Sequence, residues 1–127
     1  VGPARRGECV RWYSQAHAFL HPNMRFREPM GLAPVEAMAC GLPVIAWKYG
    51  ALKETIPNGG HAFVNDTPGF LVESLEEMVK YITFLRDNPL YPKQRENLRQ
   101  WASQFSVQNM VNRYEVLCQE AVDTGGW

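Results

Sequence analysis

The sequence has few cysteines, no net charge and no long apolar run. Its three cysteines, Cys9, Cys40 and Cys118, are odd in number and far apart, which excludes a disulfide framework and CxxC metal or redox motifs. We therefore expect three buried thiols in a reducing, cytoplasmic compartment. His17 and His21 are four residues apart in a segment that reads as a strand, where this spacing does not chelate, so we predict no metal.

The balance of charge limits the partners. Lys plus Arg (13) equals Asp plus Glu (13), so no bulk field attracts nucleic acid or an anionic membrane, and any nucleotide site must be local. No apolar run approaches the ~18 residues of a membrane span, because Glu36 interrupts the longest one. Charged residues at the start also break up any signal-peptide core: Arg5, Arg6, Glu8 and Arg11.

Hydrophobic spacing predicts an α/β fold in one domain. The segments 18–21, 32–40 and 43–47 read as strand, helix and strand, which is a βαβ unit with parallel strands. The run "PVIAW" is uninterrupted and apolar, as in a strand covered on both faces. We expect further helices at 7–15, 51–56, 69–87, 93–104 and 107–122, and a third strand at 61–64.

The helix expected from Gly69 has an apolar stripe, formed by Leu71, Leu75, Met78, Val79, Ile82 and Leu85. Three strands are few for an α/β sheet, so the chain reads as part of a larger protein. An open sheet edge and apolar patches would follow from that, and with them self-association.

Two loops follow the carboxyl ends of the first two strands, where open parallel sheets bind ligands. They are 22–31 and 48–51. Gly31, Leu32 and Ala33 open the helix, and its N–H groups form a ready site for an anion such as phosphate. We place Glu36 in the first helical turn, within reach of the same crevice.

Glu28 and Glu36 flank this helix start. A carboxylate repels phosphate but accepts well from a vicinal diol such as ribose, so two acids beside an anion site suggest a sugar nucleotide. A structural alternative stays open. The helix macrodipole favours Glu36 in a first turn whatever the function, and Glu28 could pair with Arg25 or Arg27.

The run "HPN…REPMGLAPVEAMACGLPVIAWKYGALKETI" carries more than spacing, and "EPMGLAPVE" is an E-x7-E motif. From Glu8 to Tyr114 the chain resembles the C-terminal domain of retaining GT-B glycosyltransferases of the family-4 type. The resemblance implies a Rossmann-like parallel sheet flanked by helices over residues 1–122. This would be the C-terminal half of a GT-B fold truncated at its N-terminus, with a flexible tail at 123–127.

The resemblance also implies roles for individual residues. Glu28 corresponds to the catalytic-centre glutamate that faces the hydroxyls of the donor sugar, and Glu36 to the glutamate that holds the ribose hydroxyls. Other donor-binding positions are Met30, Gly31 and Leu32 in the turn at the diphosphate, and Gly50 and Glu54 in the loop that borders the nucleotide. Arg25, Arg27 and Lys48 are candidate phosphate neighbours, with a solvated surface role as an equal alternative.

The chain departs from the family pattern in two places. The usual Gly-Gly pair is Tyr49-Gly50 or Gly50-Ala51, which makes a bulkier loop. The counterpart of the next strand is either 62–64 or 70–72, and we favour the former. The segment "SQFSVQNMVNRYEVL" is similar to the family's closing helix, which packs back toward the other domain.

The implied activity is transfer of a sugar from a nucleotide-diphosphate sugar to an acceptor hydroxyl, with retention and without a metal. The acceptor site would lie on an N-terminal domain that is missing here, so we expect the isolated chain to be inactive and to bind nucleotide weakly. The intact enzyme could be cytoplasmic or attached peripherally to a membrane. Alternatives are a GT-B-fold sugar-nucleotide epimerase and a non-catalytic nucleotide-sugar-binding module.

Overall fold

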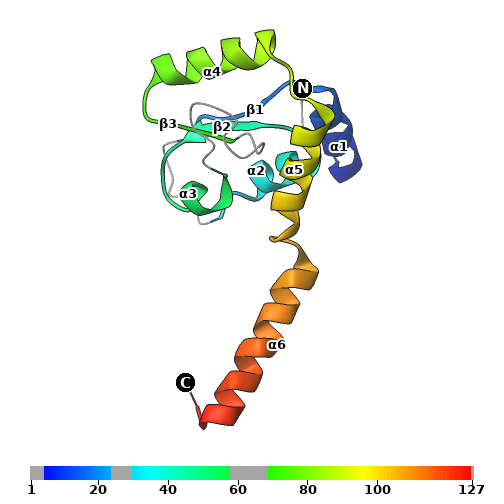
Figure 1. Cartoon of the computed structure of the whole chain (residues 1–127), viewed down its shortest axis with the longest axis vertical. Helices are drawn as coiled ribbons and strands as arrows, with labels where there is room; N and C mark the ends of the chain where they lie inside the picture. The colour runs from blue at the N-terminus through cyan, green and yellow to red at the C-terminus, as the bar shows by residue number, and fades with distance from the viewer. Residues whose placement is uncertain (1–4, 24–29, 58–68, 127) are drawn as a thin grey trace.

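The computed structural model describes residues 5–23, 30–57 and 69–126. Strands and helices alternate over the first half of the chain, and three helices end it (Figure 1). The elements are α1 (Arg6–Gln15), β1 (Phe19–His21), α2 (Leu32–Ala39), β2 (Val44–Trp47), α3 (Leu52–Thr55), β3 (Gly69–Val72), α4 (Leu75–Asp87), α5 (Pro92–Ser103) and α6 (Val107–Thr124).

The strands form one parallel sheet in the order β1-β2-β3. Ile45 at its centre lies opposite Leu20 on one side and Phe70 on the other. All four residues of β2 are buried, as the uninterrupted apolar run predicts for a strand covered on both faces. The prediction of an α/β fold with parallel strands is confirmed.

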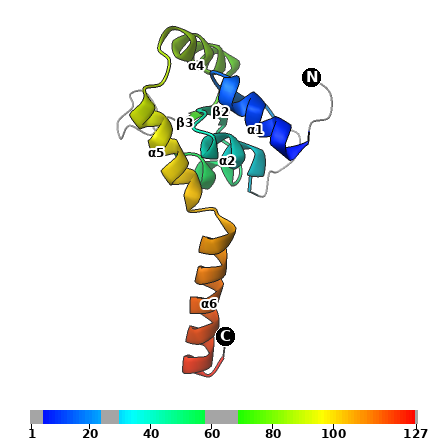
Figure 2. The same cartoon turned by 90° about the vertical axis from the view of Figure 1, so that its right-hand side faces the viewer.

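Helices cover both faces of this sheet. α4 lies on one face, against β2 and β3, and α2 lies on the other, with α5 packed outside it (Figures 1 and 2). The largest fully buried side chains join these layers: Met38, Leu42, Ile45, Leu52, Ile56, Leu85 and Leu98. Each such side chain contributes roughly 1.5–3 kcal/mol by leaving water, so the core holds α2, the sheet and α4 in fixed relation.

The segment 69–87 is not one helix, and that prediction is wrong. Gly69–Val72 is a strand, and α4 begins only at Leu75. Ser74 is its N-cap, and its Oγ accepts a hydrogen bond from the Glu77 N–H at 3.1 Å. This cap satisfies one of the N–H groups that a helix start leaves without a partner, and so fixes the boundary.

The apolar stripe predicted for α4 is also partly wrong. Met78 and Leu85 are buried, but the remaining helical members of the stripe are exposed: Leu75, Val79 and Ile82. Tyr81 is buried in their place, and its ring lies 4.6 Å from that of Phe70, centroid to centroid. The buried face therefore follows 78, 81 and 85, a narrower stripe than the apolar residues alone indicate.

The strand beside β2 is Gly69–Val72, so our preference for 62–64 as the counterpart strand is wrong and the alternative is right. The strand expected at 61–64 lies outside the described residues. Gly69 fits here because it lacks a side chain: a Cβ at this position would lie 2.3 Å from the carbonyl oxygen of Pro57. A contact across 12 residues, not visible in the local pattern, thus selects the strand.

α6 projects away from the rest of the structure (Figure 1). None of its residues is buried, and it runs to Thr124, two residues beyond the predicted end. Gly125, with φ 83°, terminates it.

Cys118 on this helix is exposed and Cys9 and Cys40 are half-buried, so the expectation of three buried thiols is wrong. Within the described ranges, no helix combines the length and the apolar character needed to cross a membrane.

Candidate functional site

The carboxyl ends of the three parallel strands meet at one edge of the sheet. Pro22 follows β1, Lys48 follows β2 and Glu73 follows β3. Three of the predicted site residues, Glu28, Arg25 and Arg27, lie outside the described residues. The others lie on α2 and the two residues before it, on the loop after β2 and on α3.

Gly31 is the N-cap of α2 and has a left-handed backbone, with φ 79° and ψ 56°. Non-glycine residues adopt this conformation at a cost of about 1 kcal/mol, so glycine suits the position. The first helical hydrogen bond runs from the Val35 N–H to the Gly31 carbonyl at 3.2 Å. Helix geometry leaves the N–H groups of Leu32 and Ala33 without an intrahelical acceptor, as an anion site requires. Leu32 is 62% exposed.

Glu36 is the fifth residue of α2, and not in the first turn, so that expectation is wrong. The helix begins at Leu32, as predicted, and its first turn ends before the fifth residue. The helix macrodipole stabilises a carboxylate mainly within the first turn, so it is a weaker explanation for a glutamate at this position. Glu36 is exposed, and its charge adds to burial in raising the pKa of Tyr13 on α1. Tyr13 is therefore a neighbour of Glu36 that the sequence did not reveal.

The loop after β2 turns at Gly50, which has φ 54°, and leads into the single turn of α3. Glu54 on that turn is exposed, whereas Leu52 and Thr55 are buried. The exposed Glu54 thus lies on a turn that the buried side chains of Leu52 and Thr55 hold in place. Met30, just before α2, is exposed to 36%.

Trp47 links the two loops at this edge. It is the last residue of β2 and only 8% exposed. Its indole Nε1 donates a hydrogen bond to the Pro22 carbonyl at 3.2 Å. This side-chain hydrogen bond joins the carboxyl ends of β1 and β2. It fixes the position of the chain where it leaves β1.

Lys48, a candidate phosphate neighbour, is engaged by an acid that the sequence analysis missed. Its Nζ lies 2.7 Å from Oε1 of Glu73, at the end of β3, in an exposed ion pair. The hydrogen bond to Glu73 raises the pKa of Lys48, and the same bond lowers the pKa of Glu73. Lys48 and Glu73 are 25 residues apart, so no local sequence pattern indicates that they pair.

We predict that Glu73→Gln lowers the melting temperature only slightly near neutral pH, because exposed ion pairs contribute little. The pair stabilises between the two shifted pKa values. Its contribution is lost as pH falls through the lowered pKa of Glu73, and as pH rises through the raised pKa of Lys48. Melting curves across pH and salt measure this, with Glu115→Gln on α6 as the control. A difference between Glu73→Gln and wild type that persists in acid or at high salt would contradict it.

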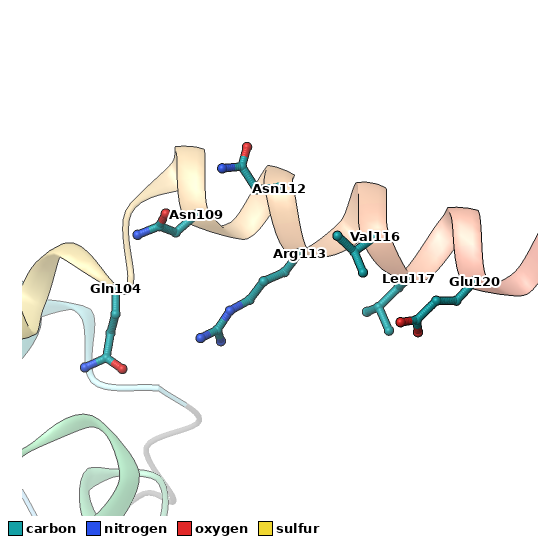
Figure 3. A pocket seen from close by; sticks show the side chains of 7 residues that line it. All are labelled: Gln104, Asn109, Asn112, Arg113, Val116, Leu117 and Glu120. Carbon is teal, nitrogen blue, oxygen red and sulfur yellow. The ribbon is translucent and has the colours of Figure 1, made fainter.

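A hollow at the surface lies elsewhere. It runs along α6 and is lined by Gln104, Asn109, Asn112, Arg113, Val116, Leu117 and Glu120 (Figure 3). Six of these seven residues belong to one helix, so the hollow has a wall on one side only. None of the predicted site residues that the structure describes lines it, and the carboxyl edge of the sheet remains the better candidate on chemical grounds.

Parallel strands with helices on both faces, and a glycine-opened helix at the carboxyl edge, define the class: a Rossmann-like α/β domain. The sequence profile of the family "Glycosyl transferases group 1" matches residues 1–105. The chain belongs to this family, as the resemblance to glycosyltransferases predicts.

Individual relatives agree. The chain is 30% identical over 95 residues, 72% of its length, to N-acetyl-alpha-D-glucosaminyl L-malate synthase of Bacillus anthracis. It is 36% identical over 87 residues, 68% of its length, to sucrose synthase 2 of Pisum sativum. A third relative is the phosphatidylinositol N-acetylglucosaminyltransferase gpi3 subunit of Schizosaccharomyces pombe, 29% identical over 122 residues or 94% of the chain.

These relatives are much longer proteins. The matched part makes up 23% of the Bacillus anthracis synthase, 10% of the pea sucrose synthase and 26% of the gpi3 subunit. The chain thus corresponds to about a quarter of such a protein or less.

Proposed function

We propose that the chain is the donor-binding portion of a retaining glycosyltransferase of the family-4, E-x7-E type. The intact enzyme would move a sugar from a nucleotide-diphosphate sugar to an acceptor hydroxyl. The observation that carries this proposal is the placement of Gly31, Glu36 and Gly50 on elements that follow the adjacent parallel strands β1 and β2. Membership of a glycosyltransferase family supports it.

The chemistry divides between backbone and side chains. The N–H groups of Leu32 and Ala33, with the Met30–Gly31 turn, would bind the diphosphate and stabilise its negative charge as it departs. Glu36 would accept hydrogen bonds from the ribose hydroxyls, and Glu28 would orient the donor sugar. Gly50 and Glu54 border the nucleotide in this proposal. Arg25, Arg27 and Lys48 supply positive charge nearby, and Lys48 does so only when it leaves Glu73.

The remaining parts of the proposal concern the whole protein. We place the acceptor site on an N-terminal GT-B domain beyond the residues present, so the chain alone turns over no substrate. The partial domain is residues 1–122 in this proposal, and the last residues of α6, to Thr124, extend into the tail at 123–127. The reaction proceeds without a metal cofactor, in the cytoplasm.

The experiment is a titration of the chain with UDP, GDP and ADP, followed by amide shifts in NMR spectra. We expect shifts at Gly31, Leu32 and Gly50, with one base preferred. Shifts confined to residues remote from the carboxyl edge would overturn the proposal, as would no response at millimolar ligand. Glycosyl transfer by the longer protein that contains this chain then separates an enzyme from a non-catalytic binding module.

Self-association through an open sheet edge and apolar patches stays a prediction, and we propose α6 as one such apolar patch. Its exposed apolar residues include Met110 (51%), Tyr114 (63%) and Leu117 (45%), which recur at helical spacing. We predict a mass that rises with concentration in sedimentation, and a monomer for the double variant Met110→Lys, Leu117→Lys. Asn112→Lys, which adds a charge away from the apolar stripe, is the control. A wild-type monomer at every concentration would exclude this surface.

A further inference from the structure

α5 contacts both helices that carry acidic residues of the candidate site. It packs beside α2, which carries Glu36 (Figure 2). It also reaches α3, which carries Glu54. The indole Nε1 of Trp101 on α5 donates a hydrogen bond to the carbonyl oxygen of Thr55 at 2.9 Å, across 46 residues of sequence.

α3 depends on such contacts for its position. It has four residues, Leu52–Thr55, and a single helical turn is not stable by itself because nucleation is costly. Leu52 and Ile56 are each 1% exposed and anchor the turn in the core. Ile56 is extended, so the helix ends at Thr55 and the last carbonyl groups have no intrahelical donor. The indole N–H of Trp101 supplies a donor to one of them.

α5 is itself fixed to the end of α2. Nη1 of Arg95 donates to the carbonyl oxygen of Gly41 at 3.4 Å, just past the last turn of α2. The guanidinium of Arg99 lies over the same residue, 3.0 Å from where a Cβ on Gly41 would stand. Positive charge at a helix C-terminus is favourable, so the two arginines hold α5 to α2. Through Trp101, the same helix then sets α3 relative to α2.

We propose that Trp101 is a positioning residue of the donor site. Its indole fixes Gly50–Thr55 against α5, so that Gly50 and Glu54 face the nucleotide held at α2. The Trp101–Thr55 hydrogen bond is the evidence that Trp101 fixes the position of Gly50–Thr55. That this position orients Gly50 and Glu54 toward a nucleotide rests in addition on the proposed function. Two measurements on the same variant separate these two claims.

The test is Trp101→Phe, which keeps an aromatic ring and removes the N–H donor. In the free protein we expect amide hydrogen exchange at Glu54, Thr55 and Ile56 to accelerate by about fivefold, because these amides close the turn of α3. With the preferred nucleoside diphosphate, we expect the dissociation constant to rise by about fivefold, which corresponds to about 1 kcal/mol.

Two controls separate positioning from general destabilisation. Trp47→Phe removes the same N–H group from an indole that bonds to Pro22, and should leave exchange at 54–56 unchanged. Leu85→Val shortens a buried side chain of α4, which packs against β2 and β3, and lowers global stability. It should leave both the local exchange and the affinity close to wild type.

Each outcome decides the proposal. Faster exchange at 54–56 together with weaker binding, in Trp101→Phe alone, supports it. Unchanged exchange overturns it, and so does faster exchange with wild-type affinity. If the wild-type chain binds no nucleotide, the proposed function fails, and the exchange measurement still decides whether Trp101 positions Gly50–Thr55.

Discussion

Glu36→Ala should weaken binding of the preferred nucleoside diphosphate by about thirtyfold. In the proposed site its carboxylate accepts from both ribose hydroxyls. A hydrogen bond to a charged group contributes about 1.5–3 kcal/mol and less where the group is exposed, so we assign about 2 kcal/mol to the two bonds together. A loss of about 2 kcal/mol corresponds to that factor, and titration by calorimetry or amide shifts measures it. Since Glu36 is exposed, the fold should stay intact when its carboxylate is removed.

The ribose assignment can be tested separately from the loss of affinity. A 2′,3′-dideoxy nucleoside diphosphate lacks the hydroxyls, so it should bind wild type about as weakly as the normal nucleotide binds Glu36→Ala. The variant should no longer distinguish the two ligands, which is the result that coupled partners give in a double-mutant cycle. Inorganic pyrophosphate should bind wild type and variant alike, or the variant more tightly once the negative charge is gone.

Glu115→Ala is the matched control, because Glu115 is an exposed glutamate on α6, far along the chain from the candidate site. It should bind every ligand as wild type does. The assignment is wrong if Glu36→Ala retains wild-type affinity, or if it still prefers the normal nucleotide over the dideoxy form. If the variant still prefers the normal nucleotide, Glu36 contacts another part of the ligand or acts through its neighbour Tyr13 on α1.

The fold could be predicted best from the sequence where one local signal decides the structure. The run at 43–47 is apolar without interruption and gives a strand buried on both faces, and Gly41 and Pro43 end the preceding helix. The order of strand, helix and strand then places the candidate site at the carboxyl edge, because the strands must be parallel. That step needed no knowledge of side-chain contacts.

Prediction failed where contacts between distant segments decide. Gly69–Val72 was assigned to α4 because Leu71 fits the apolar spacing of that helix, but it is a strand that pairs with β2, with Gly69 packed against Pro57. The Lys48–Glu73 ion pair and the Trp101–Thr55 hydrogen bond join residues 25 and 46 positions apart. Neither has a local signature. Glu36 was misplaced by one turn although the helix start at Leu32 was predicted correctly, because the fifth helical residue already lies in the second turn.

Gly69→Ala should lower the free energy of unfolding by about 3 kcal/mol. The added Cβ would lie 2.3 Å from the Pro57 carbonyl oxygen and 2.7 Å from Cγ2 of Ile56. The first of these neighbours is backbone and cannot turn aside, so the start of β3 or the end of α3 must move. Forcing a methyl group into a packed core costs about 1–3 kcal/mol, and a rigid neighbour places this case at the upper end. Urea unfolding at equilibrium measures it.

Gly7→Ala provides the matched control, since a Cβ at Gly7 meets no atom within 4 Å. Gly7 lies in α1, where alanine is the better helix former, so this variant should be slightly more stable than wild type, by about 0.5 kcal/mol. Equal stability of Gly69→Ala and wild type would mean that β3 does not pack against Pro57. A destabilised Gly69→Ala should also bind nucleotide more weakly than Leu85→Val at matched stability. The reason is that Pro57 and Ile56 directly follow the turn that carries Glu54, so displacing them moves the candidate site itself.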